Sequence, residues 1–151
     1  MRTSLAALSV VLLVGITPAV AQTQVPVVRT SSKSFENTVA ALESAIQAKG
    51  FMIVGGVDHQ NMLRMVGARA GGSRLLEFGK PDMMKQLLPQ NPEIGLTMPL
   101  RVYVYEGPNG GVLVSYYKPS DLFGAFQKKA LEGPGMMMDQ AVAEIIAAAL
   151  K

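Results

Sequence analysis

Hydrophobic residues between positions 35 and 46 recur with the period of an α-helix. The apolar face at positions i, i+4, i+7 and i+11 consists of Phe35, Val39, Leu42 and Ile46. Suitable end residues flank it, namely Ser34 as N-cap, Glu36 in the first turn, Lys49 in the last turn and Gly50 as C-cap. We therefore predict an amphipathic helix between Ser34 and Gly50, with Leu42 and Ile46 deeply buried.

Two extended segments flank this helix. Residues 22–29 are polar and valine-rich and predict an edge strand running towards Ser32. Residues 51–54, Phe-Met-Ile-Val, follow Gly50 directly and are apolar on both faces, which is typical of a central strand, and the strand continues to Asp58 and His59. Strand, helix and strand together predict one crossover unit.

The middle of the chain alternates short elements with breaks. Residues 60–66 predict a short helix capped by Asp58, with Met62, Met65 and Val66 turned inward, and Gly71-Gly72 ends this segment. Residues 75–78 predict a short strand. Residues 81–88 predict a helix because Pro81 suits its first position and Pro89 closes it, and a loop follows as far as Pro99.

A hairpin and two helices complete the chain. Residues 100–105 and 112–117 alternate in hydrophobicity around Gly107-Pro108-Asn109-Gly110-Gly111, whose residues tolerate turn dihedrals. After Pro119, Ser120 can cap a helix through Gln127, and residues 133–135, Gly-Pro-Gly, predict a break. The face of the final amphipathic helix consists of Met138, Val142, Ile145, Ile146 and Ala149.

The first 21 residues have the three-part layout of a secretory signal peptide. Met1-Arg2-Thr3 precedes the apolar run of residues 5–16, and Ala19-Val20-Ala21 matches the small-residue cleavage pattern. The run is shorter than the roughly 20 residues that span a bilayer, so we expect removal after Ala21 rather than a membrane anchor. We expect a bacterial periplasmic or secreted protein beginning at Gln22, with a lead at 22–30 and a single α+β domain at 31–151.

Composition excludes several classes of function. The chain has no cysteine, which removes disulfides, a lipobox anchor and thiolate chemistry. The formal charge is +3, the basic residues are dispersed among acidic ones, and loss of Arg2 with the signal would lower the charge further. Nucleic acid is therefore not an expected partner.

Several short segments together resemble the domain of unknown function 302 (DUF302) family. They are Gly50-Phe51, Asp58-His59, Phe78-Gly79-Lys80-Pro81, Met98-Pro99-Leu100 and Tyr117-Lys118-Pro119. The resemblance covers residues 31–126 and implies a TATA-binding-protein-like α+β fold of β-α-β-β-β-β-α type. Such a fold has a curved, mainly antiparallel sheet with helices packed on one side. The resemblance also suggests homodimers, and it does not indicate any particular activity. Lys80 stands where the family's turn usually has asparagine.

His59 is the single histidine of the chain, and histidine is the side chain that most readily exchanges protons near neutral pH. Asp58 beside it could orient the ring for acid or base catalysis. The alternative is that Asp58 caps the following helix while His59 packs at the sheet edge, and no nucleophile motif accompanies the pair.

Methionine is unusually frequent, with 10 residues. Thioethers suit Cu(I), so His59, Met62 and Met65 are candidate copper ligands in an exported protein. The competing interpretation is that methionine fills irregular core gaps and adaptable surfaces.

Further candidates lie near predicted strand ends, where binding groups often gather. The proposed ligand site combines Asp58, His59, Glu77, Phe78, Gly79, Lys80 and Tyr117. Asp121 lies at another such position, and four aromatic residues could line a pocket between sheet and helix, namely Phe78, Tyr103, Tyr105 and Tyr116. We predict a non-enzymatic binding or interaction module that takes a small molecule and forms a homodimer, with no cofactor. The alternatives are a copper-binding protein and an enzyme using His59.

Overall fold

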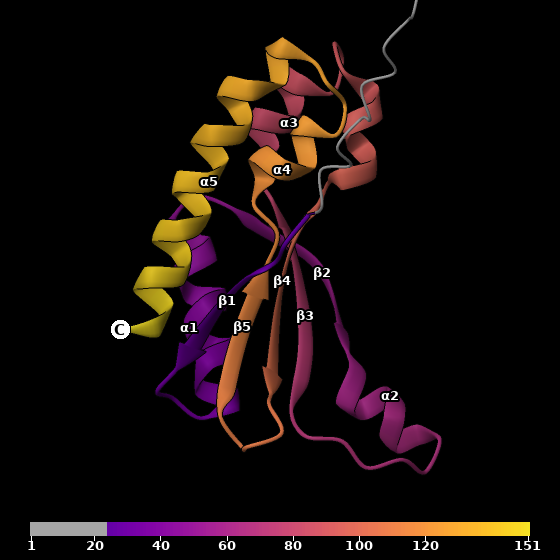
Figure 1. Ribbon diagram of the computed structural model, residues 1–151, viewed down its shortest axis with the longest axis vertical. Coiled ribbons are helices and arrows are strands. Elements are labelled where there is room, and N and C mark those ends of the chain that lie inside the picture. Colours follow the sequence, from indigo (N-terminus) through magenta and orange to yellow (C-terminus); the bar gives the residue numbers. More distant parts are fainter. Residues whose placement is uncertain (1–23) are drawn as a thin grey trace, which may run out of the picture.

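The computed structural model describes residues 24–151, and the predicted signal peptide lies outside the described residues. Five strands form one sheet in the order β1-β5-β4-β3-β2, and every neighbouring pair is antiparallel (Figure 1). The strands are β1 (Val27–Ser31), β2 (Met52–Asp58), β3 (Ser73–Gly79), β4 (Leu100–Glu106) and β5 (Val112–Tyr116). This arrangement confirms the predicted α+β class.

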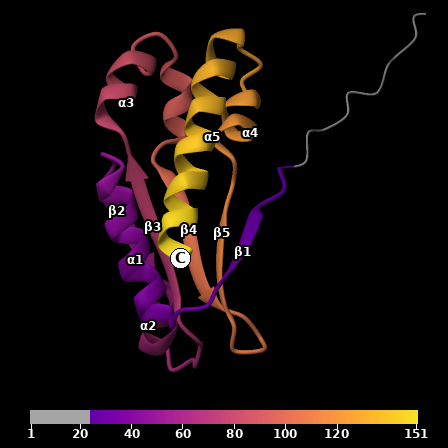
Figure 2. The same cartoon turned by 90° about the vertical axis from the view of Figure 1, so that its left-hand side faces the viewer.

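Two long helices lie side by side over one face of the sheet: α1 (Phe35–Ala48) and α5 (Lys129–Leu150) (Figure 2). Their buried residues pack against alternate residues of the strands, since neighbouring strand residues point to opposite faces. The largest fully buried side chains of this core include Leu42, Ile46, Phe78, Val102, Val114, Met138 and Ile145.

The intervening strand residues form the second face of the sheet, which is opposite the long helices. Leu75, Tyr103 and Ser115 are register partners across β3, β4 and β5, and each is only partly buried. Tyr105 and Leu113 form the next row. We call this surface, in which Arg101 is exposed, the open face.

Short helices lie at the two ends of the sheet. At one end, α3 (Pro81–Leu87), the 3-10 helix η1 (Pro92–Thr97) and α4 (Pro119–Gly124) gather beside the first half of α5, around the buried Ile94 and Phe123 (Figure 1). At the other end, α2 (His59–Met65) projects from the corner formed by β2 and β3. Of the helices within residues 24–151, none is both long and apolar enough to cross a lipid bilayer.

The predicted first helix and the hairpin are confirmed. The Ser34 hydroxyl accepts a hydrogen bond from the Asn37 backbone N–H, and Gly50, with φ of 73°, follows the C-cap in the left-handed region that glycine enters readily. Strands β4 and β5 pair from Val102–Tyr116 to Glu106–Val112 around the predicted turn. These elements were predictable because their signals are local. The predicted edge strand and the helix that begins at Pro81 are also confirmed.

The prediction that residues 51–54 form a central strand is wrong. Strand β2 pairs with β3 alone, so it is an edge of the sheet. Met52 and Val54 are 56% and 59% exposed, and only Ile53 of the strand packs against the core. The apolar run therefore alternates the inward residues Phe51 and Ile53 with the outward residues Met52 and Val54, and a bulge follows between Ile53 and Gly55.

The predicted inward face of residues 60–66 is also wrong. Helix α2 has no buried residue, and Met62, Met65 and Val66 are 56%, 78% and 78% exposed. The helix lies at the corner of the sheet, where no second layer covers it within the described part of the chain.

The Gly-Pro-Gly segment at 133–135 does not break the last helix, which begins at Lys129 and runs through it. Pro134 costs one backbone hydrogen bond. Gly135 compensates through packing, because a Cβ there would lie 2.9 Å from Ser120 Cα, so only glycine lets α4 approach α5 this closely. The glycine is therefore part of a helix contact.

Two shorter predictions need correction in the same region. Helix α4 has Lys118 as N-cap and ends at Gly124, because Pro119 occupies its first position and the Ser120 side chain has another partner. The Ser120 backbone N–H and hydroxyl donate to the Asp139 carboxylate at 2.9 and 2.6 Å. The predicted loop before Pro99 contains η1.

Candidate functional site

The structure separates the two halves of the predicted ligand site. In the antiparallel pair of β2 and β3, Asp58 lies opposite Arg74, whereas Gly79 lies opposite Met52. Six residue steps along a strand correspond to about 20 Å. The prediction that Asp58 and His59 share a site with Gly79 and Lys80 is therefore wrong, because the two pairs of residues lie at opposite ends of strands β2 and β3.

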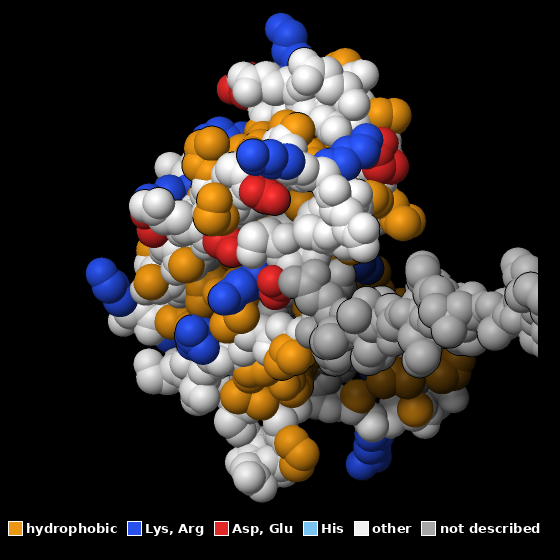
Figure 3. Space-filling model, turned by 45° about the horizontal axis from the view of Figure 1, so that its top comes forward, with side chains coloured by type: hydrophobic (Ala, Val, Ile, Leu, Met, Phe, Trp, Pro, Cys, Tyr) orange, Lys and Arg blue, Asp and Glu red, His pale blue; other side chains and the backbone are white. Residues whose placement is uncertain are grey.

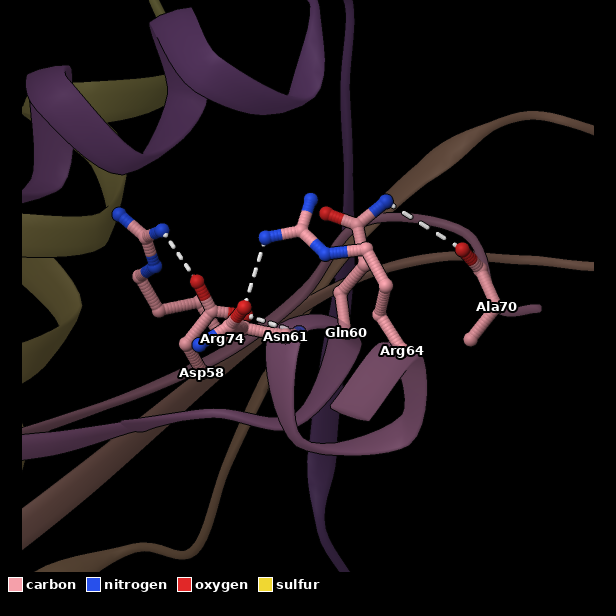
Figure 4. A network of polar contacts seen from close by, with 6 residues as sticks. All are labelled: Asp58, Gln60, Asn61, Arg64, Ala70 and Arg74. Atoms are coloured by element: carbon pink, nitrogen blue, oxygen red, sulfur yellow. Dashed lines mark hydrogen bonds and ion pairs between the residues drawn. The ribbon is translucent and has the colours of Figure 1, made fainter. Parts of the chain in front are cut away.

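Asp58 has a structural role at its end of the sheet. Its carboxylate accepts hydrogen bonds from the Asn61 backbone N–H at 2.8 Å and from the Arg74 guanidinium at 2.9 Å, as Figure 4 shows. Both hydrogen bonds lower the pKa of the Asp58 carboxyl below its ordinary value, and the one from Asn61 has the larger effect. The interpretation of Asp58 as the cap of α2 is confirmed.

His59 does not take its orientation from the Asp58 carboxylate. Its ring packs edge-on against Tyr103, with ring centroids 5.5 Å apart, and its Nδ1 atom is buried without a hydrogen-bond partner. Met62 and Met65 are exposed on the same helix. Among residues 24–151 there is no cluster of three or more His, Cys, Asp or Glu side chains that could hold a metal ion.

The other predicted candidates divide between core and surface. Phe78 is a core residue that contacts Phe51 edge-on at 5.7 Å between centroids. The Lys80 ammonium lies 5.6 Å from the centre of the Phe51 ring, a cation–π contact at the turn that precedes α3. Asp121 lies in the first turn of α4. None of these three side chains reaches the open face.

A hollow of about 310 Å³ lies on the open face, where β5 ends and β1 begins. Its lining consists of Pro26, Leu75, Arg101, Tyr103, Ser115, Tyr116 and Tyr117. We call it the tyrosine hollow. Among the predicted site residues it contains Tyr117 directly, and His59 contacts its wall through Tyr103. Glu77 lies opposite Arg101 in the strand register.

The predicted aromatic pocket between sheet and helix is thus only partly right. Tyr103 and Tyr105 lie on the open face, stacked with centroids 5.1 Å apart, whereas Phe78 points into the core on the helix side. Tyr116 packs against the core from the end of β5 and still lines the hollow. Successive side chains of a strand point to opposite faces of the sheet, so residues 101, 103 and 105 of β4 lie on the open face while residues 100, 102 and 104 face the helices.

Hydrogen bonding and charge give the tyrosine hollow a fixed, polar-edged wall. The Tyr103 and Ser73 hydroxyls are 2.6 Å apart, which holds the ring in place. Burial raises the pKa of the Tyr116 phenol above its ordinary value. Arg101 belongs to none of the three ion pairs found within residues 24–151. Its guanidinium is the hollow's cationic group.

Arg101, Leu75 and Ser115 were not among the predicted site residues. The alternation of β4 was the signal that could have revealed Arg101, because it precedes Tyr103 and Tyr105 at spacings of two and four. Leu75 and Ser115 join them only through cross-strand pairing, which depends on the strand register.

A second hollow, of about 530 Å³, lies between α4 and the first half of α5. Its lining consists of Ser120, Phe123, Gly124, Gln127, Lys128, Glu132 and Met136. Glu93 forms an ion pair with Lys128. The hydrogen bond from the Lys128 ammonium lowers the pKa of the Glu93 carboxyl below its ordinary value. Figure 3 shows hydrophobic groups separated by charged ones over this end of the molecule. Phe123 is the single aromatic residue of this lining, and its basic residue, Lys128, is already paired, whereas the tyrosine hollow has three tyrosines and Arg101.

The structure resembles the crystal structure of an uncharacterized conserved DUF302 protein from Bacillus stearothermophilus. The TM-score is 0.77 at 20% sequence identity, over 83% of this chain and 98% of that one, which is a likeness of fold. Among curated proteins, no sequence matches the chain. The family model described as "Domain of unknown function DUF302" matches residues 27–151. That match spans all five strands, and the chain therefore belongs to the DUF302 family.

Proposed function

We propose that this DUF302 domain is a non-enzymatic binding module that takes a small molecule into the tyrosine hollow. The single observation that carries the proposal is the meeting of three tyrosines and an arginine around one hollow on the open face. A volume of about 310 Å³ lies at the lower end of the range for ligand pockets. Binding, rather than catalysis, fits a wall without a nucleophile and base in contact.

The chemistry of the wall favours a flat, largely apolar ligand that carries an anionic group. Tyrosine rings offer wide apolar surfaces at low conformational cost, and the phenol groups can form hydrogen bonds at the edge. Arg101 presents a planar fork of donors that suits a carboxylate or sulfonate. Glu77, opposite Arg101, disfavours a ligand with a second negative charge near that position.

The anionic aromatic fluorophore 1-anilinonaphthalene-8-sulfonate tests this site. We expect saturable binding to the folded protein, weakened about 10-fold in Arg101→Gln by loss of a charge-assisted hydrogen bond of about 1.4 kcal/mol. Tyr117→Ala, which removes a 44% exposed ring, should also weaken binding. Fluorescence titration gives the Kd.

Lys85→Gln is the matched control, because Lys85 is an exposed basic residue on α3, outside the hollow. Thermal melting of each variant verifies that the fold is retained. Equal Kd values for the wild type, Arg101→Gln and Tyr117→Ala would contradict the proposed site.

A second proposal is that the protein is a homodimer joined through the β2 edge. Strand β2 exposes Met52 and Val54, and the segment Met52–Val54 contains no charged residue or proline, which are two of the usual blocks to edge pairing. Antiparallel pairing of β2 with β2 of a second copy would extend the sheet through a two-fold contact. The open face and its hollow would remain accessible.

Val54→Lys tests the dimer. A charged side chain on the edge opposes pairing, so we expect the dimer mass of the wild type to fall to a monomer mass at micromolar concentration. Light scattering after size-exclusion chromatography measures the mass. Val28→Lys is the control, since Val28 is 43% exposed on the opposite edge strand. A monomeric wild type, or a dimer that survives Val54→Lys, would rule out this interface.

A further inference from the structure

Helix α2 and its C-cap residue Val66 present four apolar side chains to solvent in the space of five residues. Met62, Leu63, Met65 and Val66 are 56%, 40%, 78% and 78% exposed. We call these four residues the α2 tip. It projects from a corner of the sheet (Figure 1). Apolar groups gathered in this way indicate a contact surface.

The α2 tip and the loop that follows it carry charge of one sign, and the nearby Glu106 carboxylate from β4 accepts a hydrogen bond from the Gly72 backbone N–H at 2.6 Å. Arg64 and Arg69 belong to this segment, and no Asp or Glu occurs from residue 59 to residue 76. Asp58 precedes the helix, but its carboxylate is already bound to Asn61 and Arg74. Among residues 24–151, Arg64 forms no ion pair and donates a hydrogen bond to the neutral Asn61 side chain, at 2.7 Å (Figure 4). Its positive charge therefore remains available to an anionic partner.

The two arginines also share a polar hollow beside the apolar tip. Gln60, Arg64 and Arg69 line a recess of about 240 Å³ together with Ala68 and Ala70. The Gln60 amide donates to the Ala70 carbonyl at 3.2 Å, which ties the helix to the returning loop (Figure 4). A phosphate group between two guanidinium groups is a favourable arrangement.

We propose that the α2 tip docks on a lipid bilayer that carries anionic phospholipid. The apolar side chains would enter the boundary between headgroups and acyl chains, while Arg64 and Arg69 would contact lipid phosphates. A second copy of the chain fits less well, because a two-fold contact between α2 tips would bring their arginines together, while the nearby Asp58 and Glu106 carboxylates are already bound within their own chain. This contact is peripheral and independent of the tyrosine hollow.

Vesicle co-sedimentation tests the proposal with protein purified from cells that express the full chain. The vesicles contain phosphatidylcholine alone or phosphatidylcholine with one quarter phosphatidylglycerol. We expect binding above the phosphatidylcholine background only with phosphatidylglycerol, and weakening by salt. Arg64→Gln with Arg69→Gln should lower the partition coefficient about 30-fold, and Met65→Ser with Val66→Ser at least about 10-fold.

Two control pairs match these changes away from α2. They are Lys85→Gln with Lys129→Gln, and Met136→Ser with Met137→Ser, whose methionines are 64% and 62% exposed. Both should bind like the wild type. Because every protein has the same N-terminus, differences among them report on the substituted residues.

Three outcomes would overturn the proposal. The first is the absence of additional sedimentation with phosphatidylglycerol, and the second is an equal loss in the control pairs. The third is a tip variant that keeps its vesicle binding but loses a dimer mass in light scattering, which would make the tip a self-association surface. Competition by millimolar inorganic phosphate at constant ionic strength, without any effect of Met65→Ser and Val66→Ser, would instead assign the recess to free phosphate.

Discussion

Replacing Leu42 with alanine is expected to lower the free energy of unfolding by about 2–5 kcal/mol. Leu42 is fully buried on α1, in the core that α1 and α5 build over the sheet. The loss combines the transfer free energy of the removed methyl groups with the cavity left behind. Neighbouring helices cannot fully collapse into that space, since α1 also packs against α5 and β4.

Urea unfolding followed by circular dichroism measures this change in free energy. Leu96→Ala is the matched control, because Leu96 is 85% exposed, and its effect should stay within about 0.5 kcal/mol. A Leu42→Ala effect as small as that of Leu96→Ala would mean that α1 turns a different face towards the sheet.

Gly56→Ala is expected to cost about 1–3 kcal/mol through overpacking. A Cβ at Gly56 would lie 2.6 Å from the backbone carbonyl oxygen of Leu75 on β3, a distance that real Cβ atoms essentially never show. Because the obstacle is backbone rather than a flexible side chain, relief requires the edge strand β2 to shift away from β3.

Gly111→Ala provides the comparison for that measurement. A Cβ at Gly111 would meet nothing within 4 Å, and the residue has no positive φ, so the substitution should be nearly neutral. Thermal and urea unfolding of both variants measures the difference in stability. Equal stability of Gly56→Ala and Gly111→Ala would contradict the close β2–β3 approach in the structure.

Much of the fold followed from signals within a few residues of one another. The Ser34 cap, the helical period through Ile46 and the glycine at position 50 identify α1, and the turn at 107–111 identifies the hairpin. Strand order is different, because it depends on pairing between distant segments. A run of apolar residues such as Met52-Ile53-Val54 can occur in an edge strand as well as in a central strand. Its edge position became evident only from the pairing of β2 with β3.

The candidate site was less predictable for the same reason. Sequence order suggested that Asp58 and Gly79 both mark strand ends, but antiparallel pairing places those ends at opposite corners of the sheet. The tyrosine hollow draws residues from the lead before β1 and from β3, β4 and β5, which no local pattern connects. Tyr117 was identified correctly as lying near a strand end, while its neighbour Arg101 was missed.

The secretion signal at 1–21 and the resulting location stay predictions, since they fall outside the described residues. They bear on the ligand-binding proposal and on the membrane-docking proposal. An exported domain would meet small molecules in the envelope or medium, and it would also meet membrane surfaces, which suits a hollow on the open face and a separate α2 tip.

Chemical-shift mapping tests the central claim, binding in the tyrosine hollow, most directly. The ¹⁵N-labelled protein is titrated with 1-anilinonaphthalene-8-sulfonate, and the backbone amide signals are followed to saturation. We predict that the largest shifts occur at Leu75, Tyr103, Ser115 and Tyr117, which line the tyrosine hollow. Saturable shifts confined instead to Ser120, Gln127 and Lys128, which line the hollow between α4 and α5, would contradict it.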